Sequence, residues 1–136
     1  MKSPVALLLL LLVLVAPPAS AADPAPVPLF DGLGPYSRSV STASPEAQRY
    51  FDQGLAFMYA FNHDEAIRAF KRAAELDPDC AMAHWGVAIA NGPHINNASM
   101  SPEQVATAWT AIARARDLKP HASPLEQSLI DALALR

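Results

Sequence analysis

Apolar residues recur at three- and four-residue spacing in separate blocks from residue 44 onwards. This spacing places apolar side chains on one face of an α-helix, and the strict alternation typical of a half-exposed strand does not occur. The pattern therefore predicts an all-α chain. The blocks predict helices near residues 45–60, 63–76, 80–91, 102–118 and 124–135.

Three of these helices are expected to begin at a serine that is followed by a proline. The serine hydroxyl accepts a hydrogen bond from a free N–H of the first turn, and proline is tolerated at the first helical position. We expect Asn62 and Asp79 to cap the other two helices. The serine–proline starts are Ser44-Pro45, Ser101-Pro102 and Ser123-Pro124, and Gln104 and Glu126 complete capping boxes after the last two.

Small and aromatic residues occupy fixed positions in the first two predicted helices. They match the tetratricopeptide pattern of an aromatic residue, glycine, aromatic residue, alanine, phenylalanine and proline without a gap. Gln53 departs from the pattern, since leucine is usual there, and Leu55 or Phe51 is expected to compensate. The matching residues are Tyr50, Gly54, Phe57, Ala66, Phe70, Ala73 and Pro78.

The chain therefore resembles the tetratricopeptide-repeat family, in which antiparallel helix pairs stack into a right-handed solenoid. A second, weaker copy of the pattern follows, displaced by 42 positions rather than the usual 34. We assign repeat one to 47–80, repeat two to 81–122 with an inserted loop at 92–100, and the start of a third repeat to 123–136 within an array over 44–136. The second copy comprises Ala108, Ile112, Ala115, Leu118 and Pro120.

The chain stops within the third repeat, which leaves Leu129, Ile130 and Leu133 without the second helix of that repeat. The stretches CAMAHWG and GPHINN also resemble the N-terminal part of long secreted bacterial tetratricopeptide proteins whose activity is unassigned. This resemblance implies that further repeats of a longer chain are among the partners of this segment.

The N-terminal segment has the features of a secretory signal peptide. Lys2 precedes an apolar run from Val5 to Ala16, which is too short to span a bilayer, and small residues follow at 19–21. Residues 1–21 are therefore predicted to be removed, so that the protein meets the membrane only during export to the periplasm or exterior of a bacterium. Residues 22–43 are rich in proline and are expected to form an extended leader.

Composition narrows the range of functions. The chain has a formal net charge of −3 and no cluster of Lys and Arg, which argues against a nucleic-acid partner. Cys80 is the only cysteine, so no internal disulfide can form. No catalytic motif and no phosphate-binding loop is present, and the sequence predicts neither an enzyme nor a bound cofactor.

Metal and haem binding provide the alternative hypothesis, a redox accessory protein of the periplasm. Cys80 to His84 resembles a haem-attachment motif in which Ala83 replaces the second cysteine. His84 and His94 are the candidate metal ligands, because an inserted loop that folds back would bring them together. A histidine on a helix face is more often a core residue than a ligand.

The leading hypothesis is an exported scaffold that binds another protein or an extended peptide without catalytic activity of its own. The binding groove is expected on the first helix of each repeat, among residues that point away from the partner helix. Exposed aromatic residues there would suit an extended peptide or a helix. The groove candidates are Phe51, Asp52, Leu55, Tyr59, Trp85 and Ile89.

We predict that the protein, expressed with its N-terminal segment in a bacterium, is found outside the cytoplasm with Ala22 or Asp23 as its first residue. N-terminal sequencing and intact mass of the periplasmic fraction check this. Periplasmic protein that retains Met1 would contradict it.

Overall fold

The computed structural model describes residues 26–136, and regular structure in this part of the chain is helical. The signal peptide predicted at 1–21 and the first leader residues lie outside the described residues. No helix within 26–136 is long and apolar enough to cross a membrane. The helices are α1 (Pro45–Tyr59), α2 (His63–Leu76), α3 (Ala81–Asn91), α4 (Pro102–Leu118), a 3₁₀ turn (Lys119–His121) and α5 (Pro124–Ala134).

The helix starts follow the capping pattern of the sequence, with one exception. Ser44, Ser101 and Ser123 each accept a hydrogen bond from a backbone N–H of the first turn, and both predicted capping boxes form. The exception is α3, which begins after Cys80 with no side-chain cap. The predicted cap, Asp79, instead pairs with Arg114 of α4 at 3.3 Å.

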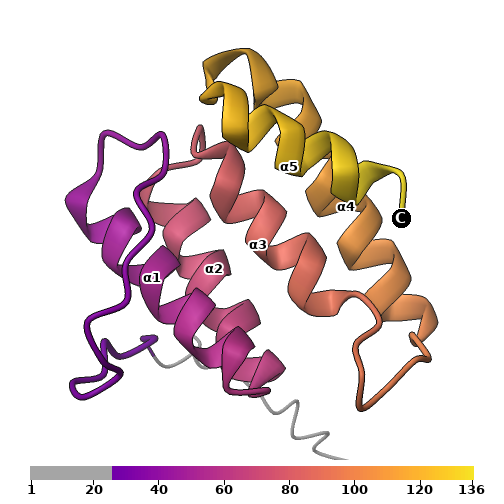
Figure 1. Ribbon diagram of the computed structural model, residues 1–136, viewed down its shortest axis with the longest axis horizontal. Helices are drawn as coiled ribbons and strands as arrows, with labels where there is room; N and C mark the ends of the chain where they lie inside the picture. Colours follow the sequence, from indigo (N-terminus) through magenta and orange to yellow (C-terminus); the bar gives the residue numbers. More distant parts are fainter. Residues whose placement is uncertain (1–25) are drawn as a thin grey trace, which may run out of the picture.

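The helices stack as adjacent antiparallel pairs, as in a tetratricopeptide-type solenoid. Figure 1 shows α3 between the α1–α2 pair on one side and α4 and α5 on the other. Because α3 is covered from both sides, most of its residues are buried, including Trp85, Val87 and Ala88. The predicted all-α fold of paired helices is confirmed.

The Phe70 ring of α2 lies where α1, α2 and α3 meet, and it is fully buried. A Cβ atom on Gly54 of α1 would lie 2.5 Å from this ring, and one on Gly86 of α3 would lie 2.4 Å from it. Both distances are well below van der Waals contact, so only glycine fits at either position. Phe51 packs on the same ring, with centroids 5.5 Å apart. Two glycines on different helices thus let both helices close on one aromatic side chain.

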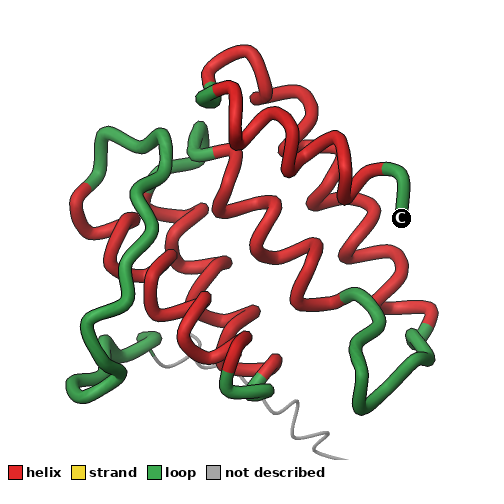
Figure 2. The backbone as a smooth tube through the Cα atoms, in the orientation of Figure 1, coloured by secondary structure: helices red, strands yellow, loops and turns green. Residues whose placement is uncertain are grey.

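Two long loops flank the helices (Figure 2). The leader, residues 26–43, precedes α1 without forming a helix. The inserted loop joins α3 to α4 and is closed by two main-chain hydrogen bonds between His94 and Asn97, of 2.9 and 3.0 Å.

We predict that Gly54→Ala and Gly86→Ala each lower the free energy of unfolding. Overpacking against Phe70 should cost about 1–3 kcal/mol, while the better helix propensity of alanine returns up to about 1 kcal/mol. Chemical denaturation measures the net effect. In a Phe70→Leu background the ring is gone, so the cost of each alanine should shrink or reverse. Alanines that stabilise the protein with Phe70 in place would show that the contact is not tight.

Candidate functional site

The leader lies along α1 and is held there by polar side chains of that helix. Gln53 is only 5% exposed, and its amide bonds the leader main chain twice. Its Oε1 accepts from the Phe30 N–H at 2.8 Å, and its Nε2 donates to the Pro28 carbonyl at 2.9 Å. This explains why a glutamine stands where the repeat pattern has leucine. Leu55 and Phe51, which were expected to compensate for the missing leucine, are both buried in the core.

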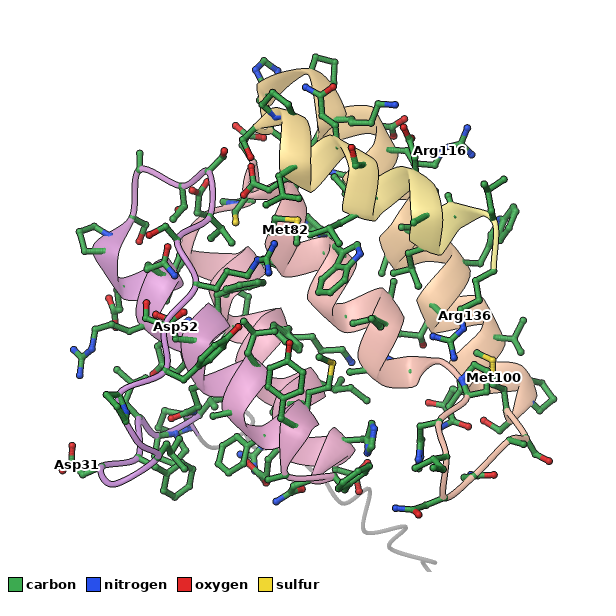
Figure 3. The ribbon with its side chains drawn as sticks, viewed as in Figure 1. Asp31, Asp52, Met82, Met100, Arg116 and Arg136 are labelled. Atoms are coloured by element: carbon green, nitrogen blue, oxygen red, sulfur yellow. The ribbon has the colours of Figure 1, made fainter. Side chains whose placement is uncertain are left out.

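Three further α1 residues continue this contact towards both ends of the leader. Asp52 accepts from the Arg38 N–H at 2.9 Å, and Figure 3 places Asp52 beside the leader. Gln48 accepts from the Val40 N–H at 3.0 Å and donates to the Arg38 carbonyl at 2.9 Å. The Tyr50 hydroxyl donates to the carbonyl of residue 27 at 2.7 Å. We call Gln48, Tyr50, Asp52 and Gln53 the leader face.

The end of the leader is fastened to α5. Glu126, which is 3% exposed, accepts hydrogen bonds from the N–H and hydroxyl of Ser41 and from the Ser123 N–H of its own capping box. Burial raises the pKa of Glu126, but the hydrogen bonds from Ser41 and Ser123 lower it by more, so it lies below its ordinary value. One carboxylate therefore joins the leader to the last helix.

Most of the predicted groove candidates do not line an open groove. Phe51, Leu55 and Trp85 are buried in the core, at 0%, 1% and 8% exposure. The Trp85 indole N–H donates to the Leu129 carbonyl at 3.1 Å, so α5 covers the face of α3 that was expected to be free. Helical periodicity shows that a face is apolar, but it cannot show which later helix packs on that face.

The other three candidates have different surroundings. Asp52 binds the leader, and Ile89 is half-buried against the core. Tyr59 alone is well exposed, at 60%, and its ring meets that of Tyr36 edge to face with centroids 5.9 Å apart. The face of α1 is thus a contact surface, and its occupant in this structure is the leader.

The predicted pair of histidine ligands, His84 and His94, does not form. His84 Nε2 lies 3.1 Å from the Pro78 carbonyl, and burial lowers the pKa of its ring. His94 instead stacks on His63 at the start of α2, with centroids 3.9 Å apart and planes 15° apart. Ring nitrogens of stacked imidazoles point outwards in parallel planes, so the pair does not converge on a metal ion.

The haem and metal alternative finds no further support in residues 26–136. Within this range no three His, Cys, Asp or Glu side chains are grouped to hold a metal ion. The Cys80 thiol is 1% exposed, and burial raises its pKa, which disfavours the reactive thiolate. Its side chain belongs to the hydrophobic core.

A second surface lies between the C-terminal ends of α3 and α5 and the side of α4. It forms a cleft of about 320 Å³ with mostly apolar walls. Trp109 stands at this cleft with 70% of its surface exposed, and Val105, one turn before it, is 49% exposed. We call this the C-terminal cleft, and its main lining residues are Met100, Val105, Trp109, Ile112, Leu133 and Arg136.

Arg136 is the one charged residue among those that line the C-terminal cleft. Its guanidinium donates to the Pro93 carbonyl at 2.8 Å, and Figure 3 shows Arg136 and Met100 on the same side of the molecule. Sequence reasoning missed this cleft. Trp109 indicates this surface in the sequence. It directly follows Ala108, which occupies a helix-packing position of the repeat pattern, so the Trp109 side chain points away from the contact between the paired helices.

Comparison with known families identifies a tetratricopeptide repeat at residues 47–80. Repeats of this type generally bind other proteins or peptides and are typically not catalytic. No curated protein and no solved structure matches the chain. The match supports the resemblance to the tetratricopeptide family and a role in protein–protein interaction.

We predict that Glu126→Gln lowers the free energy of unfolding by about 1–3 kcal/mol at pH 7, since charge-assisted hydrogen bonds to Ser41 are lost. The folded-state pKa lies below the ordinary value of 4.5. The stabilisation is therefore complete above the unfolded-state pKa and is lost as the pH falls through the folded-state pKa.

Thermal melts from pH 7 to pH 3 measure the difference between the two proteins. It should be constant near neutrality and shrink below about pH 4.5. Glu103→Gln, in the exposed first turn of α4, is the control and should shift stability by less than about 0.5 kcal/mol at pH 7. A difference that grew on acidification would contradict the assignment.

Proposed function

We propose that this protein is an exported scaffold that binds another protein by taking an amphipathic helix of that partner into the C-terminal cleft. The observation that carries the proposal is the cleft itself, an apolar hollow of about 320 Å³ with an exposed tryptophan beside it. Pockets of this size are within the range that holds an apolar ligand or anchoring side chains. Exposed tryptophans are enriched among the residues that dominate binding energy.

The pairing of the helices supports a helix as the occupant. α1 packs antiparallel to α2, and α3 packs antiparallel to α4. Each of these pairs joins two helices that are consecutive in the chain. α5 begins with the same capping chemistry, and its Leu133 lines the cleft together with Val105 and Trp109 of α4. A helix laid antiparallel to α5 would bury Trp109, Val105 and Leu133 together.

Charge at the cleft adds a feature of the partner. The Arg136 guanidinium forms no ion pair with a carboxylate of residues 26–136, and it donates to the Pro93 carbonyl. A bidentate bond to a carboxylate is the strongest interaction its guanidinium can make. The partner helix is therefore expected to carry Asp or Glu beside its apolar face.

Export is the second part of the proposal. The basic residue, apolar run and small residues of 1–21 support it, and the lone buried Cys80 avoids disulfide errors in an oxidising compartment. The family of the repeat supports interaction rather than catalysis. An exported scaffold of this kind would act by bringing its partner to a place outside the cytoplasm.

Site-specific photo-crosslinking in the native host tests the cleft. A photoreactive residue at Val105 should form an adduct whose crosslinked segment, identified by mass spectrometry, is an amphipathic helix with an acidic residue. Adding Trp109→Ala should weaken the complex about 30-fold or more, which corresponds to about 2 kcal/mol for an anchoring aromatic residue. Because Trp109 is exposed, the melting temperature should change little.

The matched control places the same photoreactive residue at Ile95 of the inserted loop, which is 88% exposed. It should give no such adduct. Adducts that persist with Trp109→Ala, or that map to an extended segment, would overturn the cleft as the binding site. An adduct within a longer form of the same chain would identify the occupant as a further repeat and would also overturn the partner proposed here.

A further inference from the structure

The base of the inserted loop forms one wall of the C-terminal cleft. Gly92 and Pro93 at its start and Met100 at its end line the cleft beside side chains of α4 and α5. This loop lengthens the second repeat, which is displaced by 42 positions where 34 are usual. Because the loop supplies part of the binding surface, the contacts that hold the loop in place also shape the cleft.

Hydrogen bonds within the loop give it a shape without attaching it to a helix. His94 and Asn97 exchange two main-chain hydrogen bonds of 2.9 and 3.0 Å, and the Asn97 Oδ1 accepts from the Ser99 N–H at 3.0 Å. A first attachment of the loop is the Pro93 carbonyl, which accepts from the Arg136 guanidinium after α5 at 2.8 Å. This attachment lies at the cleft itself.

The ring of His94 provides a second attachment, on the side of the loop away from α5. It stacks on the ring of His63 at the start of α2, with centroids 3.9 Å apart and planes 15° apart. The His94 Nδ1 is buried and forms no hydrogen bond with residues 26–136, so that atom does not hold the ring and the stack does. The His63 ring is fixed by its own turn, because its Nδ1 lies 3.2 Å from the Phe61 carbonyl.

We propose that His63 and His94 are positioning residues of the C-terminal cleft, because their stack holds the inserted loop in place as a wall of that cleft. Neither histidine is among the residues that line the cleft. They act through Pro93, which directly precedes His94, and through Met100 at the other end of the loop. The inference rests on the function proposed above, since the partner helix is the occupant that this wall would position.

The stack matters most when the cleft is occupied. A carboxylate of the partner would compete with the Pro93 carbonyl for the Arg136 guanidinium, and the charged acceptor makes the stronger bond. The stack of His94 on His63 uses no group of the cleft, so it is unaffected by this exchange. It therefore keeps Pro93 and Met100 beside the partner helix after the first attachment is lost.

The first test uses the whole exported chain without a partner. His63→Ala removes one ring of the stack and leaves every lining residue of the cleft unchanged. The N–H groups of His94 and Asn97 should then exchange about three to ten times faster, because a stacked aromatic pair favours the closed loop by about that factor. The isotope-labelled methyl group of Met100 should shift in the NMR spectrum, whereas the methyl group of Met82 in the core should not.

Two further variants serve as controls. His63→Phe keeps a planar ring at this position and should bring the exchange rates within about twofold of those of the unaltered protein. His121→Ala removes an exposed histidine outside the loop and the cleft and should alter neither measurement. Unchanged exchange in a folded His63→Ala protein, an unmoved Met100 methyl group, or an equal response to His121→Ala would each refute the proposal. Thermal melts establish that the variants are folded.

The crosslinking experiment at Val105 separates this inference from the proposed function. His63→Ala should lower the yield of the adduct at least about threefold, and His63→Phe should restore it. An adduct that forms equally well in His63→Ala would show that the stack does not position the partner. If the unaltered protein gives no adduct, the proposed function fails, and the exchange and methyl measurements still decide whether the stack shapes the cleft.

Discussion

The contact of Phe70 with Gly54 and Gly86 is the constraint on which the other helices depend. The ring of α2 fills the space between α1 and α3, and only glycine lets those helices come close enough to enclose it. Once α3 is fixed against this ring, the opposite side of α3 receives α4 and α5. Trp85 and Ile130 then complete the core on that side. One aromatic side chain thus sets the spacing of the first three helices and, through α3, the position of the last two.

Outside the apolar core, polar side chains hold the leader in place. Along α1 the side chains of Gln48, Asp52 and Gln53 satisfy the main chain of the leader, which has no helix or sheet to do so. Glu126 performs the same role at the other end by holding Ser41 against α5. The leader is thus held by these hydrogen bonds together with Val27, Leu29 and Val40, which pack against the core.

The leader face and the C-terminal cleft differ in chemistry. The leader face offers donors and acceptors to the main chain of the leader, whereas the C-terminal cleft offers mostly apolar walls and Arg136. They involve different helices, α1 for the first and mainly α4 and α5 for the second. The first surface thus holds a segment of the same chain, and the second is the proposed site for a partner.

The sequence by itself determined the helices, their N-terminal caps except that of α3, and the repeat positions of Gly54 and Phe70, because helical periodicity and capping depend on neighbours in the chain. Only the tertiary structure decided which faces stay open. Trp85 was expected in a groove and lies under α5, while His94 was expected near His84 and stacks on His63. These outcomes depend on contacts between residues far apart in the chain. A single sequence records that a face is apolar or polar, but the arrangement of the helices determines what covers that face.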